Sequence, residues 1–82
     1  MRIEVKHRST DVNFLKGLIS RRLNAYPGVA EKLDIYLQGD KIIIKRHEED
    51  GREPLDEATF LMIAEDLPID FEKQGVDYTQ VY

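Results

Sequence analysis

The segment from Leu33 to Arg46, LDIYLQGDKIIIKR, places a Gly-Asp dipeptide between two runs that are rich in β-branched and aromatic residues. A dipeptide of this kind between two strand-forming runs is typical of a two-residue β-hairpin turn. Such a short loop fixes the pairing of the strands, because each residue before the turn then faces one residue after it. The segment therefore predicts a hairpin of strands 33–38 and 41–46 with a defined register.

The predicted register sorts the side chains of the hairpin onto two faces. Gln38 faces Lys41 across the turn, and the pairing continues to Asp34 opposite Lys45 as a pair of opposite charge. One face is apolar and is expected in the core: Leu33, Ile35, Leu37, Ile42 and Ile44. The other face is mostly polar and is expected to be open to solvent: Asp34, Tyr36, Gln38, Lys41, Ile43 and Lys45.

Two patterns precede the hairpin. In residues 2–7, the apolar Ile3 and Val5 alternate with charged side chains, which indicates a strand with one buried face. The tripeptide Ser-Thr-Asp then offers three possible helix N-caps, and apolar residues recur at helical spacing until the Pro-Gly dipeptide at 27–28. This pattern predicts a helix over residues 11–25.

A second helix and a tail follow the hairpin. Pro54 suits the first turn of a helix, and the apolar run that follows it stops at Pro68, so we predict a helix over 55–67. Residues 68–75 are compatible with a turn, a short strand or irregular chain. In the tail, Val76, Tyr78 and Gln80 alternate with other residues, which favours a last strand.

The predicted order of elements is β-α-β-β-α-β, the split β-α-β order of ferredoxin-like sandwiches. We therefore expect an α+β fold with two layers. Right-handed crossovers place the first and third strands in the centre of an antiparallel four-stranded sheet, with both helices on one face. The alternative is a β-α-β-β-α domain whose tail is not a strand. With 82 residues, of which 41% are hydrophobic, the chain is long enough for one domain, residues 1–82.

Composition also bears on location. The sequence contains no cysteine, which suits a reducing compartment. Its N-terminus has no apolar block of signal-peptide length, and nowhere do enough apolar residues follow one another to span a membrane. We expect a cytoplasmic protein that does not interact with membranes.

Known catalytic and ligand-binding patterns do not occur. A metal or acid–base site would need His7 and His47 close together, but the predicted topology separates them by about 15–20 Å at about 3.3 Å per strand residue. The glycines are scattered singly and form no phosphate-binding loop. We therefore expect a non-enzymatic protein without a metal or other cofactor.

Charge is distributed unevenly along the chain. Residues 1–47 have a net charge of +5 and residues 48–82 a net charge of −9. The acidic segment predicts a negative surface around the second helix that could bind a basic surface of another protein, as an inhibitor or accessory factor does. The alternative is that the two halves attract each other within one fold. We call the following residues the acidic surface: Glu48, Glu49, Asp50, Glu53, Asp56, Glu57, Glu65 and Asp66.

The open face of the predicted sheet has the opposite charge. Its side chains from the first three strands, with Arg8, sum to a net charge of about +3. A basic sheet that carries an aromatic side chain resembles in kind the sheets that stack RNA bases, so nucleic-acid binding is the alternative function. A solvated sheet face protected by lysines is the simpler interpretation. The candidate nucleic-acid residues are Arg2, Lys6, Arg8, Tyr36, Lys41, Ile43 and Lys45.

Overall fold

The computed structural model describes residues 2–7, 11–47 and 53–81. The strands and helices follow one another in the predicted order β-α-β-β-α-β, with one short 3₁₀ helix, η1, added before the hairpin. Their bounds are β1 Arg2–His7, α1 Val12–Asn24, η1 Ala30–Lys32, β2 Leu33–Gln38, β3 Lys41–Arg46, α2 Glu57–Lys73 and β4 Tyr78–Val81.

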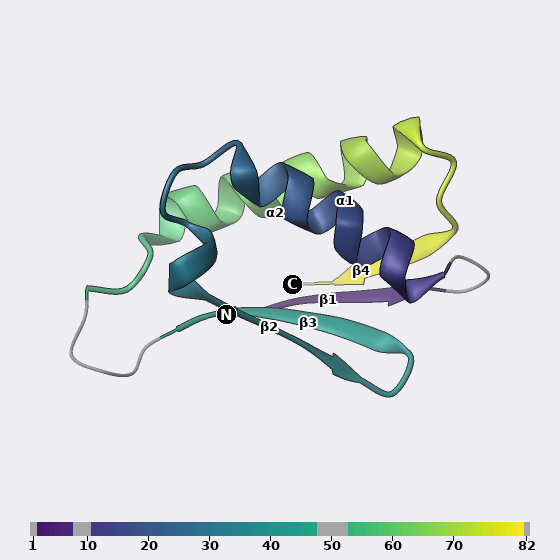
Figure 1. Cartoon of the computed structure of the whole chain (residues 1–82), viewed down its shortest axis with the longest axis horizontal. Helices are drawn as coiled ribbons and strands as arrows, with labels where there is room; N and C mark the ends of the chain where they lie inside the picture. The colour runs from purple at the N-terminus through teal and green to yellow at the C-terminus, as the bar shows by residue number, and fades with distance from the viewer. Residues whose placement is uncertain (1, 8–10, 48–52, 82) are drawn as a thin grey trace.

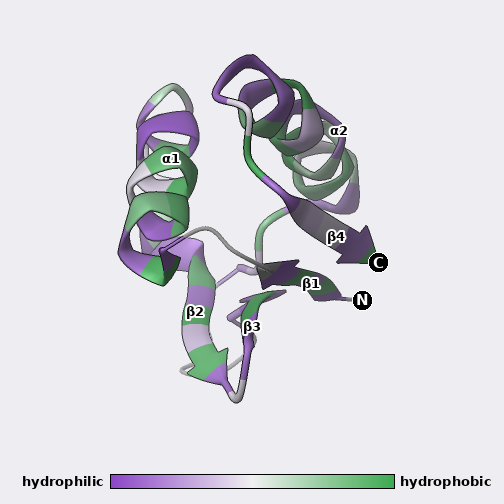
Figure 2. Ribbon diagram, turned by 90° about the vertical axis from the view of Figure 1, so that its right-hand side faces the viewer, coloured by the Kyte–Doolittle hydropathy of each residue, from purple (hydrophilic) through white to green (hydrophobic). Residues whose placement is uncertain are grey.

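The four strands form one antiparallel sheet in the order β2-β3-β1-β4, so β3 and β1 are central as predicted. Both helices lie on the same side of this sheet (Figure 1). Viewed from the side, α1 lies above β2, and α2 lies above the other end of the sheet near β4 (Figure 2). The two-layer α+β fold expected from the sequence is therefore confirmed.

The hairpin register is also confirmed. Tyr36 faces Ile43, and Gln38 faces Lys41 beside the turn. Gly39 has a φ of 63°, in the left-handed region that glycine adopts without steric cost. At the other end of the hairpin, the backbone N–H of His47 donates to the carbonyl of Lys32 over 2.8 Å, which extends the β2–β3 ladder by one pair.

The core lies between the sheet and the two helices. β1 and β3 contribute aliphatic side chains from their inner faces, and α1 and α2 contribute one apolar stripe each. Burying a side chain of this size contributes about 1.5–3 kcal/mol. The fully or almost fully buried members include Ile3, Val5, Leu15, Ile19, Ile42, Ile44, Phe60, Ile63, Leu67 and Phe71.

Helix α1 begins and ends close to the predicted positions. Its N-cap is Asp11, whose carboxylate accepts a 2.9 Å hydrogen bond from the backbone N–H of Asn13. Arg21 and Arg22 lie in its last turn, where positive charge is favoured by the helix dipole. The N-cap was one of the three that the sequence offered.

Helix α2 differs from the prediction at both ends. It begins at Glu57 after the N-cap Asp56, so Pro54 precedes the helix. It also continues through Pro68 to Lys73, and the prediction that the helix ends at Pro68 is wrong. A proline inside a helix leaves the carbonyl four residues earlier without its usual donor. Here that carbonyl, on Ala64, accepts a hydrogen bond from the side chain of Gln80 on β4.

The tail forms the last strand, as predicted, but over a shorter range. β4 spans Tyr78–Val81 and pairs with β1, and Val76 lies outside it and packs against the core. The ring of Tyr78 meets that of Phe71 edge to face at a centroid distance of 4.8 Å. The alternative without a last strand is therefore wrong.

Candidate functional site

The acidic surface is only partly described by the structure. Glu48, Glu49 and Asp50 lie outside the described residues. Four of the remaining predicted residues are exposed, and we call them the exposed acidic group: Glu53, Asp56, Glu57 and Glu65. Glu53 and Asp56 lie in the segment that leads into α2, and Glu57 and Glu65 lie on α2 itself.

Asp56 has a structural role at the start of α2. Its carboxylate accepts hydrogen bonds from the backbone N–H of Thr59 at 2.9 Å and from the Thr59 hydroxyl at 2.8 Å. Both bonds lower the pKa of Asp56 below its usual value, and the bond from the backbone N–H has the larger effect. The side chain stays exposed while it caps the helix, so it can both stabilise α2 and contribute negative charge to the surface.

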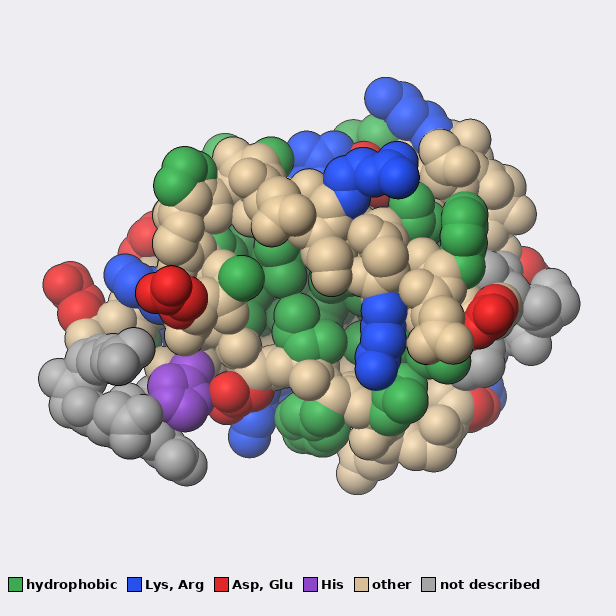
Figure 3. Space-filling view, in the orientation of Figure 1, with side chains coloured by type: hydrophobic (Ala, Val, Ile, Leu, Met, Phe, Trp, Pro, Cys, Tyr) green, Lys and Arg blue, Asp and Glu red, His purple; other side chains and the backbone are tan. Residues whose placement is uncertain are grey.

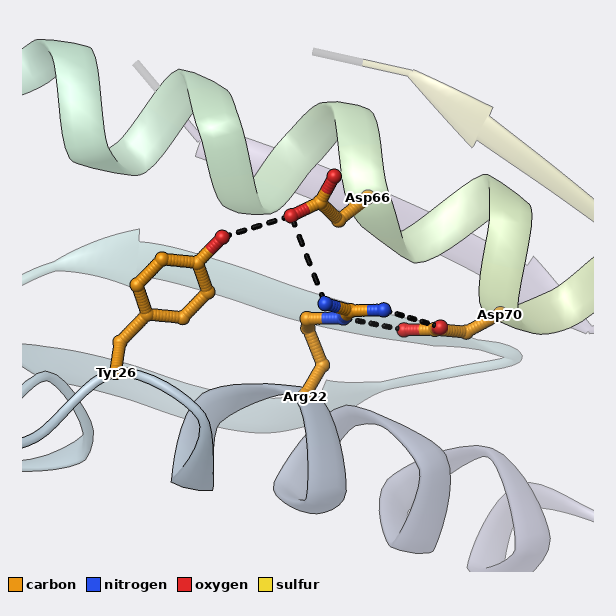
Figure 4. Close-up of polar contacts among 4 residues, drawn as sticks. All are labelled: Arg22, Tyr26, Asp66 and Asp70. Atoms are coloured by element: carbon orange, nitrogen blue, oxygen red, sulfur yellow. Dashed lines mark hydrogen bonds and ion pairs between the residues drawn. The ribbon is translucent and has the colours of Figure 1, made fainter.

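The eighth predicted residue, Asp66, contacts α1. Its carboxylate accepts a 2.7 Å hydrogen bond from the Tyr26 hydroxyl and lies 3.7 Å from the guanidinium of Arg22. Arg22 also donates two hydrogen bonds, of 2.7 and 2.6 Å, to the carboxylate of Asp70 (Figure 4). These four half-buried side chains form a polar cluster, the interhelix cluster, that joins α1 to α2.

The electrostatics of the interhelix cluster follow from its contacts. The hydrogen bonds from Arg22 lower the pKa of Asp70. The hydrogen bond to Asp66, followed by burial, raises the pKa of Tyr26. Arg22 belongs to the basic half of the sequence and both aspartates to the acidic half. Part of the charge asymmetry is therefore used inside the fold, as the alternative interpretation expected.

The basic face of the sheet carries most of its predicted residues. Arg8 lies outside the described residues. The register of β1, β2 and β3 places the other candidate nucleic-acid residues on the face of the sheet away from the helices. Two of these basic side chains form ion pairs: Arg2 with Glu4 at 2.9 Å, and Lys6 with Asp40 at 3.4 Å. Exposed pairs of this kind contribute little to stability, but each one lowers the charge offered to a phosphate.

Ile43 does not belong to an exposed nucleic-acid surface. Although its register puts it on the open face, its side chain is 0% exposed. It lies in the central strand β3, where side chains of the neighbouring strands surround it, and it is separate from the main core cluster. The prediction that Ile43 contributes to an open binding face is therefore corrected.

Tyr36 is the exposed aromatic of this face. Its ring is 38% exposed, and the ammonium of Lys45 lies 5.8 Å from the ring centroid in a cation–π arrangement. Asp34 is the backbone partner of Lys45, as predicted. Its carboxylate, however, lies within hydrogen-bonding distance, 2.9 Å, of Nδ1 of His47. The predicted cross-strand register is therefore correct, but the side chain of Asp34 contacts His47 and that of Lys45 contacts Tyr36.

The two histidines lie at opposite ends of the sheet. His47 follows β3, whereas His7 ends β1 next to the residue that pairs with Lys41 at the start of β3. Among the described residues, no group of three or more His, Asp or Glu side chains is arranged to hold a metal ion. Nor does any helix in the described ranges have the length and apolar character needed to cross a membrane.

One feature of the hairpin was missed at the sequence level. Ile35 and Leu37 were placed in the core, but they are 37% and 46% exposed. β2 is the edge of the sheet, and Leu33 at its beginning is buried, whereas Ile35 and Leu37 further along it are not. Figure 3 shows hydrophobic side chains exposed across the middle of the face that carries α1 and β2. Alternation gives the face on which a side chain lies, but not how much of that face is covered.

The sequence matches no protein-family model and no curated protein.

Proposed function

We propose that this protein is a non-enzymatic protein-interaction domain whose acidic surface binds a basic surface of another protein, as an inhibitor or accessory factor does. The observation that supports it most directly is the free state of three carboxylates. Within the described ranges, the side chains of Glu53, Glu57 and Glu65 are exposed and take part in no hydrogen bond or ion pair.

The contrast with the rest of α2 supports the same proposal. Asp66 and Asp70 are held by Arg22 on the side of α2 that faces α1. The exposed acidic group is not neutralised in this way, so its field extends into solvent. Charges at the rim of an interface act mainly by steering the encounter and by selecting partners of opposite charge. A basic protein in the cytoplasm is the partner that this charge favours.

Nucleic-acid binding on the open sheet is the second candidate. It is favoured by Lys45, whose ammonium lies over the exposed Tyr36 ring, and by Lys41, which the register places on the same face of the sheet. The pairing of Arg2 and Lys6 with acids weakens it, as do the burial of Ile43 and the net charge of −4. Such binding would weaken steeply with salt because phosphate contacts release counterions. A gel-shift panel of single- and double-stranded DNA and RNA at low salt, with no shift at tens of micromolar protein, would eliminate it.

Affinity capture with charge-reversed variants tests the leading proposal. The chain is immobilised, partners are captured from a lysate of its native cell, and the captured protein is identified and purified. Its association rate is then measured with the wild type and with the double variant Glu53→Lys/Glu57→Lys. We expect the reversal to slow association by about tenfold at low salt.

The matched control is Glu31→Lys/Glu72→Lys, which changes the net charge by the same amount at exposed residues that do not belong to the acidic surface, Glu72 lying at the far end of α2. Circular dichroism establishes that both variants fold. If the control slows association as much as the test variant, net charge alone is responsible and the acidic surface is not the binding site. The proposal also fails if neither variant changes the rate.

A further inference from the structure

The outer edge of β2 has no partner strand among the described residues. β2 ends the sheet, and its hairpin partner β3 pairs with only one of its two sides. In Figure 2, β2 lies at the margin of the sheet below α1. An edge strand presents a row of free N–H and C=O groups on which another strand can pair.

The directions of these backbone groups can be assigned. In an antiparallel ladder, residues alternate between pairs that exchange hydrogen bonds and pairs that do not. The bond from the N–H of His47 to the carbonyl of Lys32 assigns Lys32 to the first kind. Asp34, Tyr36 and Gln38 then also point their backbone groups at β3, so Ile35 and Leu37 point theirs outward.

The same part of the strand is apolar on both faces. Ile35, Tyr36 and Leu37 are consecutive, and each is at least 37% exposed. The usual protections of an edge are a proline, a charged side chain or a bulge, and none occurs at these three positions. The free backbone groups and the exposed apolar side chains therefore coincide.

We infer that a second copy of this chain pairs with β2 in antiparallel orientation, with Tyr36 on the two-fold axis. In this register Ile35 lies opposite Leu37 of the second copy, and Leu37 lies opposite its Ile35. All four residues point their backbone groups across the axis, so each opposed pair exchanges two hydrogen bonds. The two four-stranded sheets then form one continuous sheet.

The side chains match on both faces. On the helix side, Ile35 and Leu37 of the two copies form one aliphatic cluster. On the open side, the two Tyr36 rings are adjacent in a non-hydrogen-bonded pair, where cross-strand aromatic contacts are closest. Asp34 faces the uncharged Gln38, so no like charges are opposed next to the axis. A two-fold interface needs this kind of self-complementary strand.

The neighbouring register, with Ile35 on the axis, is less favourable. It also places outward-pointing residues opposite each other, but it pairs the exposed Leu37 with Leu33, which is already 92% covered by its own chain. It also sets Asp34 against Tyr36 instead of Gln38. The register centred on Tyr36 therefore covers more of the exposed apolar surface.

The dimer has a distinctive response to salt. Three exposed side chains and a short strand bury less than the ~800 Å² per partner of a standard interface, so association is weak and depends on concentration. Each copy has a net charge of −4, and salt screens the repulsion between two such copies. Dimerisation therefore strengthens as salt rises, whereas the binding of a basic partner weakens. The two proposals are independent and can fail separately.

Analytical ultracentrifugation of the wild type tests the association itself. Over a series from low micromolar to millimolar concentration, we expect the mass to rise from 9.6 kDa toward twice that value. Leu37→Lys should stay monomeric throughout, although it reduces the net negative charge and so reduces general repulsion. Val81→Lys makes the same charge change on the other edge strand, β4, at a residue that is 57% exposed, and should dimerise like the wild type.

Disulfide trapping tests the register, since the chain contains no cysteine. Under oxidising conditions, Tyr36→Cys should form a covalent dimer because each cysteine meets its own symmetry mate, and Gln38→Cys should not. Preferential trapping by Ile35→Cys would overturn the register. The pairing at β2 would be overturned if the wild type remained monomeric at millimolar concentration. It would also be overturned if Val81→Lys abolished the dimer and Leu37→Lys did not.

Discussion

The side-chain amide of Gln80 donates a 2.7 Å hydrogen bond to the backbone carbonyl of Ala64, which lies four residues before Pro68. An ordinary residue at position 68 would supply that carbonyl with a backbone N–H, and proline cannot. Strand β4 therefore supplies the donor that the helix lacks. The Tyr78 hydroxyl approaches the carbonyl of Pro68 itself at 3.5 Å, so two side chains of β4 serve this turn of α2.

We predict that Gln80→Leu lowers the free energy of unfolding by about 1–3 kcal/mol. The substitution replaces the amide with an apolar side chain of similar size and leaves the Ala64 carbonyl without a partner in a partly buried place, and an unsatisfied buried acceptor is costly. Chemical denaturation followed by circular dichroism measures the change.

The same substitution in a Pro68→Ala background provides the control. Alanine restores the backbone N–H at position 68, which can then bond the Ala64 carbonyl, so Gln80→Leu should cost much less there. The difference between the two backgrounds is the coupling energy of a double-mutant cycle. Equal costs in both backgrounds would show that Gln80 does not compensate for the proline.

This helix explains which parts of the fold the sequence could predict. The register of the hairpin depends on Gly39, Asp40 and their immediate neighbours, so a local pattern was sufficient. The end of α2 depends on Gln80, which lies 16 positions after Ala64. A local pattern reads Pro68 as a stop, because the donor that allows the helix to continue comes from another element.

The candidate surfaces divide in the same way. Exposure of Glu53 and Glu57 follows from their polar loop and helix start, and sequence reasoning placed them correctly on the surface. Asp70 bonds a residue 48 positions away, Arg22, and no local signal assigns such a partner. The exposure of Ile35 and of Leu37 depends on how much of the edge strand β2 is covered by the rest of the fold, which alternation does not encode.

The interhelix cluster should make stability depend on acid pH. Arg22 lowers the pKa of Asp70, so this carboxylate stabilises the fold above its unfolded pKa of about 3.9, and the contribution is lost as pH falls through the folded pKa. We predict that Asp70→Asn lowers the free energy of unfolding by about 1–2 kcal/mol at neutral pH. The difference in the free energy of unfolding between Asp70→Asn and the wild type should shrink below about pH 4.

Urea denaturation across a pH series measures this gap. The control is Glu31→Gln, an exposed acid without a bonding partner in the described ranges, which should leave the wild-type profile unchanged. A gap for Asp70→Asn that stays constant down to strongly acid pH would mean that the carboxylate is not ionised against Arg22.

Tyr26 should make the stability of the fold depend on alkaline pH. Its hydroxyl donates to Asp66, and this bond, with burial, raises the pKa of Tyr26. A raised pKa stabilises the fold below the unfolded value of about 10, and the effect is lost as pH rises through the folded pKa. We predict that Tyr26→Phe costs about 1–2 kcal/mol at neutral pH and progressively less in strong base. Tyr36→Phe, at an exposed ring, should cost nothing measurable at either pH.

Ile44 and Leu37 lie on the same face of the hairpin, but their contributions to stability should differ. Ile44 is 0% exposed in a central strand, so Ile44→Ala leaves a cavity and should cost about 2–5 kcal/mol. Leu37 is 46% exposed at the edge, so Leu37→Ala should cost less than about 1 kcal/mol in the monomer.

Denaturation at low micromolar concentration, where the chain is monomeric, measures both costs. At millimolar concentration the cost of Leu37→Ala should rise, because the second copy then covers this side chain and a ligand that binds only the folded state stabilises it by mass action. The cost of Ile44→Ala should not depend on concentration in the same way. A cost below 1 kcal/mol for Ile44→Ala would mean that the core is wrongly placed, and an unchanging cost for Leu37→Ala would argue against dimerisation through β2.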